Sequence, residues 1–251
     1  MPKTAVVTGA GSGVGRATAI RLIKEGWSVA LVGRREDALR ETASLTNDPA
    51  RTFVVPCDVA DPAAVMKMAA EVLNRFGSVD ALVHAAGTNI PKRSWDVLTI
   101  DDYRQVIDIN LNGAFYCVRA LLPAMRTRGE GTIVLIVSDA GIIANAKAGA
   151  AYVASKFAER GLAQSINAEE RAHGIRCTAL CPGDINTPIL EKRPAPPTGR
   201  GPCQDATTGR CSRVRHARDQ PAEPRRGGGI GASAEVNAGE FLPQMNTDGH
   251  R

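Results

Sequence analysis

Short apolar segments alternate with longer amphipathic segments along the first 180 residues of the chain. Continuous apolar runs are typical of strands buried on both faces, whereas the longer segments repeat their apolar positions with a helical period. The predicted strands are Lys3–Thr8, Ser28–Val32, Thr52–Val55, Val79–Val83, Gly131–Val137 and Ile175–Leu180. The predicted helices run from the turn after Thr8 to Glu25 and over Glu36–Leu45, Pro62–Phe76, Ile100–Met125 and Ala150–Ala172. This alternation predicts an α/β fold with a doubly wound parallel sheet of six strands.

The alternating pattern stops near residue 198. The last 54 residues contain 8 Arg and no Lys, together with 9 Gly, 4 Pro and only four Val, Ile or Leu. A segment so poor in apolar residues cannot supply a normal strand or helix face. We therefore predict one domain over residues 1–197 and an aberrant, disordered tail rich in Arg, Gly and Pro over residues 198–251.

The composition argues against several classes of protein. Lys and Arg total 31 against 26 Asp and Glu, and this formal charge of +5 is spread along the chain, so we expect no nucleic-acid partner. The longest aliphatic run, Ile133–Val137, is far too short to cross a bilayer, so we expect no membrane association. Six cysteines lack CxxC spacing and four histidines lack metal-ligand spacing, which predicts no metal site. Reduced thiols, and a first strand that begins directly after Met1-Pro2, predict a cytoplasmic protein.

A glycine-rich turn joins the first predicted strand to the first helix. It reads Thr8-Gly9-Ala10-Gly11-Ser12-Gly13-Val14-Gly15. Glycines allow a tight turn and a close approach of the backbone to a pyrophosphate, which then rests on the helix N-terminus. The position of this turn predicts a Rossmann-like dinucleotide site, with cofactor contacts from Thr8, Gly9, Ser12, Gly13, Val14 and Gly15.

The end of the second strand distinguishes the two nicotinamide cofactors. Enzymes that bind NAD place an acidic residue there to accept a hydrogen bond from the ribose 2′-hydroxyl. This chain has Gly33-Arg34-Arg35 instead. Two guanidinium groups favour a 2′-phosphate, so we predict NADP(H), with NAD(H) as the alternative. In the alternative, both arginines face solvent beside Glu36 and Asp37.

Tyr152 and Lys156 are four residues apart and therefore share one face of a predicted helix. A phenol titrates near pH 10 in water, and a neighbouring cation favours its phenolate form. Such a pair can act as a general acid and base near neutral pH.

Further motifs follow the later strands. They are Cys57-Asp58-Val59, His84-Ala85-Ala86-Gly87, Ile109-Asn110-Leu111-Asn112-Gly113, Val137-Ser138-Asp139-Ala140-Gly141 and Cys181-Pro182-Gly183-Asp184-Ile185-Asn186-Thr187-Pro188. With the Thr-Gly-x-x-x-Gly-x-Gly turn and the Tyr-x-x-x-Lys pair, they make the chain resemble the classical short-chain dehydrogenase/reductase family over about residues 3–193. Within the family, the chain resembles 3-oxoacyl reductase-like members.

The resemblance implies a role for each matched residue. Tyr152 exchanges a proton with the substrate oxygen, Lys156 holds the nicotinamide ribose, Ser138 stabilises the oxyanion and Asn110 holds a proton-relay water. Asn112 is the competing candidate for the last role. Ser138 precedes Tyr152 by fourteen residues, against thirteen in the family, and the following Ala140-Gly141 supports the match. Implied cofactor contacts are Asp58, Val59, Ala86, Gly87, Tyr152, Lys156, Pro182, Gly183, Ile185 and Thr187.

The chain departs from the family after its fourth strand. His84 and Ala85 stand where the family has two Asn residues, so the polar side chains that usually support this loop are absent. We expect His84 and His173 to be structural, and we expect Asp139 and Asp184 to be loop residues without a catalytic role.

The resemblance implies an oxidoreductase that transfers a hydride between NADP(H) and a secondary alcohol or carbonyl compound. The alternative is a catalytically impaired nucleotide-binding or regulatory relative. Residues expected to line a medium-sized, partly apolar substrate pocket are Asn89, Ile90, Arg93, Trp95, Ile142 to Asn145, Ile189 and Leu190, with Arg93 solvated at the surface. An intact family member is expected to form a homodimer or homotetramer.

Family members continue after the Pro-Gly turn with further helices and a seventh strand, which residues 198–251 do not predict. One explanation is a disordered tail, and another is a single-nucleotide frameshift near Thr198. Codons read one base forward over residues 204–231 admit a capped amphipathic helix, a turn and a strand-like run, as the family requires.

We predict that sequencing the gene around codon 198 will reveal the frameshift. A restored frame should encode the missing helix and seventh strand. The same unshifted frame in independent isolates would instead establish the tail as genuine.

Overall fold

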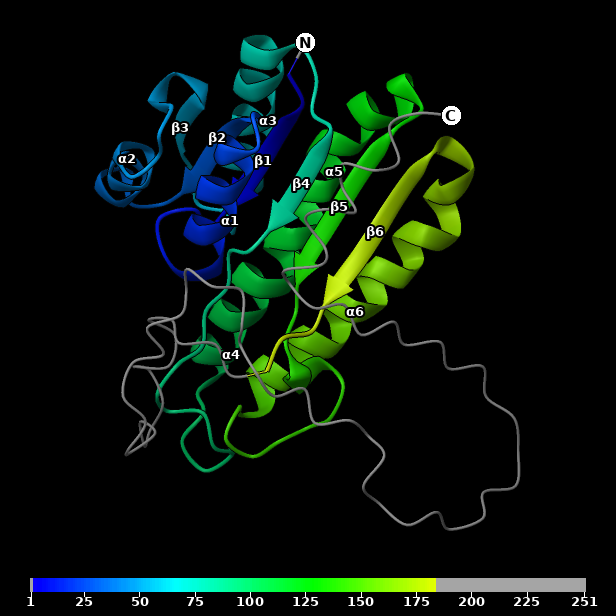
Figure 1. Ribbon diagram of the computed structural model, residues 1–251. Coiled ribbons are helices and arrows are strands. Elements are labelled where there is room, and N and C mark those ends of the chain that lie inside the picture. The colour runs from blue at the N-terminus through cyan, green and yellow to red at the C-terminus, as the bar shows by residue number, and fades with distance from the viewer. Residues whose placement is uncertain (1, 184–251) are drawn as a thin grey trace, which may run out of the picture.

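The computed structural model describes residues 2–183, which contain one sheet of six parallel strands (Figure 1). The strands are β1 Thr4–Thr8, β2 Ser28–Gly33, β3 Thr52–Pro56, β4 Ala81–His84, β5 Gly131–Ile136 and β6 Ile175–Leu180. Their order in the sheet is β3-β2-β1-β4-β5-β6. The predicted Rossmann-like, doubly wound sheet is confirmed, and the fourth strand begins two residues later than predicted.

The helices agree with the sequence pattern except at one place. They are α1 Gly13–Lys24, α2 Glu36–Ser44, α3 Pro62–Phe76, α4 Ile100–Ile107, α5 Gly113–Arg128 and α6 Ala150–Glu170. The helical stretch predicted over Ile100–Met125 is helical throughout, but a π-helical turn, η2 Asp108–Asn112, lies between α4 and α5. Single π turns inside helices are frequent at functional sites, and this one contains Asn110.

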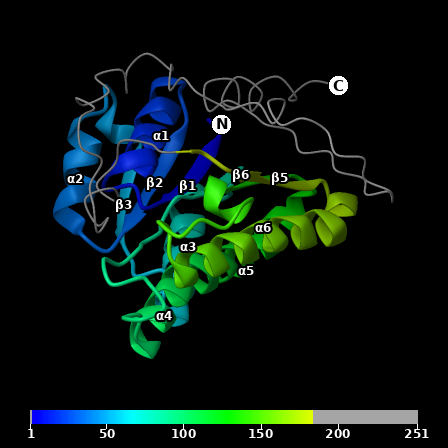
Figure 2. The same cartoon turned by 90° about the horizontal axis from the view of Figure 1, so that it is seen from below.

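Two hydrophobic cores hold the layers together (Figure 2). Alternate residues of each strand point to opposite faces, so Val6 of β1 belongs to one core whereas Ala5 and Val7 belong to the other. Helices α3, α5 and α6 pack on the Val6 face, and α1 and α2 pack on the opposite face. Strands buried on both faces explain the continuous apolar runs in the sequence.

The strand order reverses between β1 and β4, which are direct neighbours in the sheet. Loops that follow these two strands leave the sheet in opposite directions, and ligands of open α/β folds bind in the crevice between them. Helix α4 lies below the carboxyl ends of the strands in Figure 1. This edge therefore collects the loops in which the sequence places the candidate site.

A threonine hydroxyl joins the loops at this reversal. Thr8 Oγ1 accepts hydrogen bonds from the backbone N–H groups of Ala85 and Ala86, both at 3.1 Å. Its own proton remains to donate to Nδ1 of His84, also at 3.1 Å. Thr8 thus supports the end of β4 and the loop after it through three hydrogen bonds.

His84 is completely buried at the end of β4. Burial, together with the nearby Lys156 ammonium, lowers the pKa of the imidazole to about 3. The ring is therefore neutral at physiological pH, in agreement with its predicted structural role.

Several predictions lie outside the described residues. They concern Ile185, Thr187, Asp184, Ile189, Leu190, the absent seventh strand, the tail over residues 198–251 and the frameshift. Within residues 2–183, no helix combines the length and apolar character that a membrane span requires.

The neutral, buried imidazole predicts a specific acid destabilisation. The pKa of His84 is lower in the folded chain than in the unfolded chain, so its stabilising contribution is complete above about pH 6.5 and is lost as the pH falls toward 3. At pH 4 this contribution is smaller by roughly 3 kcal/mol than at pH 7. Urea unfolding of the wild type and His84→Asn at both pH values measures the difference. A stability difference that is the same at pH 7 and pH 4 would contradict the prediction.

Candidate active site

The turn between β1 and α1 forms a cradle in which glycine is required. Gly9 has φ +66°, and a Cβ there would lie 2.7 Å from the carbonyl oxygen of Ala85. A Cβ on Gly15 would lie 2.4 Å from the carbonyl oxygen of Gly9, so α1 packs directly against the loop. Ser12 is the N-cap of α1, and its side chain makes no capping hydrogen bond. Amide N–H groups of the first turn, which includes Gly13 and Val14, are therefore left to an anion.

Arg16 stabilises this turn through hydrogen bonds, a role that the sequence interpretation missed. Its Nη2 donates to the carbonyl oxygen of Gly11 at 2.7 Å. The same guanidinium forms a two-bond ion pair with Glu41 of α2, with N–O distances of 3.0 and 2.7 Å. The arginine therefore connects α1, α2 and the turn, and its position directly after the last glycine was the available signal.

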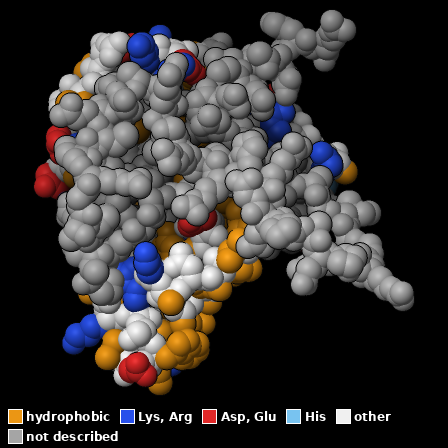
Figure 3. Space-filling view, turned by 60° about the horizontal axis from the view of Figure 1, so that its bottom comes forward, with side chains coloured by type: hydrophobic (Ala, Val, Ile, Leu, Met, Phe, Trp, Pro, Cys, Tyr) orange, Lys and Arg blue, Asp and Glu red, His pale blue; other side chains and the backbone are white. Residues whose placement is uncertain are grey.

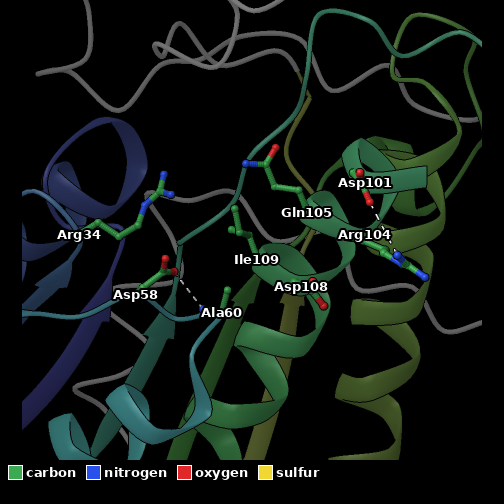
Figure 4. Close-up of a pocket in the computed structure, with 8 residues that line it drawn as sticks. All are labelled: Arg34, Asp58, Ala60, Asp101, Arg104, Gln105, Asp108 and Ile109. Carbon is green, nitrogen blue, oxygen red and sulfur yellow. Dashed lines mark hydrogen bonds and ion pairs between the residues drawn. The ribbon is translucent and has the colours of Figure 1, made fainter. Parts of the chain in front are cut away.

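Two hollows open at the carboxyl edge of the sheet, and Arg34 lines both. The smaller, of about 110 Å³, is lined by Gly9, Gly11, Ser12, Gly33, Arg34, Arg35 and Leu39. The larger, of about 310 Å³, is lined by Arg34, Asp58, Ala60, Asp101, Arg104, Gln105, Asp108 and Ile109. Figure 4 shows Arg34 and Asp58 on one side of this hollow and residues of α4 on the other. An elongated ligand lying across both hollows would pass Arg34.

The side chains around the two arginines agree with an anion site. Arg34 and Arg35 are exposed. The carboxylate of Glu36, the nearest acidic residue in sequence, forms an ion pair with Arg40 of α2 at 2.5 Å. Asp58 is turned toward its own loop, since its Oδ1 accepts from the backbone N–H of Ala60 at 3.1 Å.

Asn110 connects two elements that flank the site. Its Oδ1 accepts from the backbone N–H of Thr88 at 2.7 Å, and its Nδ2 donates to the Thr88 carbonyl and to Ser155 Oγ, both at 3.0 Å. These bonds join the loop after β4 to α6 through a fully buried amide. Asn112, the competing candidate, instead donates to Asp108 at an exposed position.

Tyr152 and Lys156 lie on α6, next to the hydrogen bonds of Asn110. The Nζ of Lys156 lies 5.6 Å from the ring centroid of Tyr152 and donates to the carbonyl oxygen of Ile136 at 3.0 Å. A Cβ on Gly87 would lie 3.5 Å from Asn110 Oδ1 and 3.7 Å from Lys156 Nζ. The fold therefore brings Gly87, Asn110, Tyr152 and Lys156 together, as their predicted roles require.

Ser138 follows β5, at the start of a short turn that packs against α6. Its hydroxyl donates to Asp139 Oδ1 at 2.8 Å and accepts from the backbone N–H of Ala140 at 3.2 Å. A Cβ on Gly141 would lie 2.7 Å from the carbonyl oxygen of Lys156, so this turn packs directly on the helix that carries Tyr152. The serine proton is thus engaged by a neighbouring carboxylate that sequence reasoning treated only as a loop residue.

Glu159 is a second residue that the sequence interpretation missed. Its carboxylate is completely buried and accepts from Lys156 Nζ at 2.5 Å. Burial raises the pKa of Glu159 to about 7, although the adjacent ammonium acts in the opposite direction. The signal was available, because Glu159 lies one turn after Lys156 on the buried face of α6, where an acidic residue requires a partner.

Other predicted residues are dispersed around the site. Val59 packs on Gly113 at the start of α5, where a Cβ on the glycine would approach the valine to 2.8 Å. The Pro182 carbonyl accepts from the backbone N–H of Asp139 at 2.9 Å, and Gly183 is the last described residue. Among residues 2–183, no group of three or more His, Cys, Asp or Glu side chains is arranged to hold a metal ion.

The predicted substrate residues divide into buried and exposed sets. Asn89 and Ile90 are buried, and Asn89 Nδ2 donates to the Ala148 carbonyl at 2.9 Å. Arg93 was expected in solvent, which is wrong: it is 6 % exposed, and its Nη1 donates to the Lys147 carbonyl at 3.2 Å. Trp95, by contrast, is 84 % exposed. Hydrophobic side chains gather on the lower part of the surface in Figure 3, toward α4.

Comparisons with known proteins agree with this arrangement. Residues 3–197 match the family described as short chain dehydrogenase. A 3beta-hydroxysteroid dehydrogenase from Mediterraneibacter gnavus is 39% identical over 194 residues, which cover 77% of this chain and 70% of that protein. A 2-dehydro-3-deoxy-L-rhamnonate dehydrogenase (NAD(+)) from a Sphingomonas species is 40% identical over 193 residues, with 76% of each chain covered.

A solved structure is similar as well. A variant of actinorhodin polyketide ketoreductase with NADPH shares 34% of its sequence and superposes with a TM-score of 0.72, covering 76% of this chain and 74% of that one. The glycine cradle, the Tyr152–Lys156 pair and these similarities lead to one conclusion. The chain belongs to the short-chain dehydrogenase/reductase family of NAD(P)-dependent oxidoreductases.

Proposed function

We propose that this enzyme transfers a hydride between NADP(H) and a secondary alcohol or the corresponding carbonyl compound, with Tyr152 as general acid and base. One observation carries the proposal: the buried ammonium of Lys156 lies 5.6 Å from the ring centroid of Tyr152 and next to Gly87 and Asn110. A phenol in this place can give a proton to a substrate oxygen or take one from it, as a general acid and base.

The residues of the carboxyl edge fit a dinucleotide. The uncapped N-terminus of α1, which follows a turn of closely packed glycines, suits a pyrophosphate. In the proposal, contacts to the cofactor come from Thr8, Gly9, Ser12, Gly13, Val14, Gly15, Arg34, Arg35, Asp58, Val59, Ala86, Gly87, Tyr152, Lys156, Pro182, Gly183, Ile185 and Thr187. When bound, the nicotinamide supplies or accepts the hydride.

The side chains of the enzyme manage the proton and the developing charge. During reduction, the Tyr152 hydroxyl gives its proton to the carbonyl oxygen, and during oxidation it takes a proton from the alcohol. Lys156 holds the ribose hydroxyls, and Asn110 holds a relay water beside it. Ser138 donates to the oxyanion, for which its hydroxyl must turn away from Asp139 Oδ1, its acceptor in this structure.

One feature of the chain supports NADP(H) over NAD(H). Arg34 and Arg35 follow Gly33 at the end of β2, where an acceptor for a ribose hydroxyl would require an acidic side chain. Guanidinium groups instead form strong, paired hydrogen bonds with phosphate. The ketoreductase named above was solved with NADPH, whereas the rhamnonate dehydrogenase is named for NAD(+), so the comparisons favour neither cofactor and the proposal rests on the arginines.

The surroundings of Tyr152 favour a partly apolar substrate. The ring packs against a small cluster formed by Ile90, Val106 and Ala151. A medium-sized secondary alcohol or ketone with an apolar part therefore fits the proposal best.

We also propose assembly into a homodimer or homotetramer in the cytoplasm. Exposed apolar side chains on neighbouring helices, including Ile100 and Tyr103 of α4 and Phe115 of α5, support association between copies. The four described cysteines are free thiols, and three of them are buried, which suits a reducing compartment.

The first test compares the cofactors. We expect wild type to bind NADPH about 100-fold more tightly than NADH, because two guanidinium groups bind the 2′-phosphate. Replacing both arginines in Arg34→Ala/Arg35→Ala should remove this preference and leave NADH binding unchanged. Arg40→Ala, which removes a neighbouring arginine paired with Glu36, is the matched control. Fluorescence titration measures the affinity of all three proteins for both cofactors. Tighter binding of NADH than of NADPH by wild type would contradict the proposal.

The second test separates turnover from binding. Tyr152→Phe should reduce kcat by roughly 100- to 10,000-fold, because it removes the proton donor. NADPH affinity should stay close to that of wild type. Tyr103→Phe, at an exposed tyrosine of α4, is the control and should retain full activity. Absorbance assays with a panel of ketones provide the rates. Wild type that binds NADPH but reduces no ketone would favour the catalytically impaired alternative.

A further inference from the structure

The proposed reaction leaves Glu159 without a role, although it is the group closest to the Lys156 ammonium. The carboxylate lies one helical turn after Lys156 on α6, is 0 % exposed, and accepts from Nζ through Oε2 at 2.5 Å. Its other oxygen, Oε1, is also buried and has no hydrogen-bond partner within the part of the chain that the structure describes. Burying an ionised carboxylate costs free energy of folding unless the charge is paired and hydrogen-bonded.

The geometry limits what the ammonium can do. An ammonium group has three N–H donors. One donates to the Ile136 carbonyl at 3.0 Å and a second to Glu159 at 2.5 Å. A single donor therefore remains for a ligand beside Gly87 and Tyr152, and the two anchors restrict the direction in which it points.

The two anchors differ in one respect. The Ile136 carbonyl has the same acceptor strength at every pH, whereas the Glu159 carboxyl can gain a proton and lose its negative charge. When Glu159 is neutral, the buried ammonium has lost its counter-ion and is held less firmly. The position of Lys156 thus depends on the ionisation state of Glu159.

Other charged or titratable groups near the pair do not substitute for Glu159. They are Arg160 on the same helix, His84 at the end of β4, Cys181 after β6, and Asp139 in the short turn η3 Asp139–Gly141 that packs on α6. The imidazole is neutral above about pH 3, burial raises the pKa of the Cys181 thiol, and Asp139 accepts from Ser138. Tyr152, the proton donor of the proposed reaction, also faces Lys156. A pH dependence of NADPH affinity that Tyr152→Phe retains and Glu159→Gln lacks is therefore assigned to Glu159.

We propose that Glu159 is a positioning residue for the oxidoreductase: its ionised carboxylate holds the Lys156 ammonium so that one N–H faces the nicotinamide ribose. Cofactor binding and turnover then increase with pH as Glu159 ionises. This inference rests on the proposed function, since it assumes that Lys156 binds the ribose.

The experiment compares wild type with Glu159→Gln, which keeps the size and the acceptor oxygen but cannot ionise. The equilibrium affinity for NADPH is measured between pH 5.5 and 8.5. A second probe, adenosine 2′,5′-bisphosphate, carries the adenine half of the cofactor without the nicotinamide ribose. We expect equal NADPH affinities at pH 5.5 and about tenfold weaker binding by the variant at pH 8.5, with no difference for the bisphosphate.

Kinetics and two further variants complete the test. The pH profile of kcat/KM should show an ionisation in wild type that Glu159→Gln lacks and that Glu159→Asp partly restores. Glu170→Gln is the matched control, because Glu170 is another buried carboxylate of α6, paired with Arg126 far from Lys156. It should lower stability and leave the NADPH pH profile unchanged.

Two results would overturn the inference. One is a ratio of NADPH affinities that does not change with pH. The other is an equal loss of affinity for NADPH and for the bisphosphate, which would indicate a purely structural role. Failure of the proposed function itself would give a different result, because wild type would then already neither bind NADPH nor reduce a ketone.

Discussion

The side chain of Lys156 carries its ammonium into a position that is only 4 % exposed. Removing an ammonium from water costs several kcal/mol unless acceptors and an anion replace the lost hydration. The fold supplies the Ile136 carbonyl from β5 and the Glu159 carboxylate from α6. These two anchors place Nζ beside Gly87 and Tyr152, so the contacts of the candidate site depend on how this one charge is accommodated.

The parallel sheet makes such an arrangement possible, because all its strands deliver their loops to the same edge. Thr8 joins the loops after β1 and β4 through backbone N–H groups of Ala85 and Ala86, and Asn110 joins the loop after β4 to α6. Each bond connects segments far apart in sequence. Together they hold the glycine cradle and the Tyr152–Lys156 pair in one rigid edge, which favours a site organised before its ligand arrives.

Sequence reasoning predicted the sheet, and it named most of the residues that the fold gathers at the carboxyl edge, because apolar runs and glycine spacing are local signals. It could not find the π turn at Asp108–Asn112, since one extra residue in a helical turn barely changes the periodicity. It also missed Glu159 and misjudged Arg93, because charged side chains are usually exposed and only the packing reveals their burial. The hydroxyl of Thr8 supports the loop after β4 through contacts with residues more than seventy positions away, which no local pattern indicates.

The central claim is that a buried, Glu159-anchored ammonium and two arginines organise the binding of NADP(H). A crystal structure of the chain with NADPH tests it most directly. The account predicts that Lys156 Nζ donates to the nicotinamide ribose while it keeps its bond to Glu159, and that Arg34 and Arg35 bind the 2′-phosphate. A cofactor bound with Lys156 turned away from the ribose, or with the 2′-phosphate remote from both arginines, would contradict it.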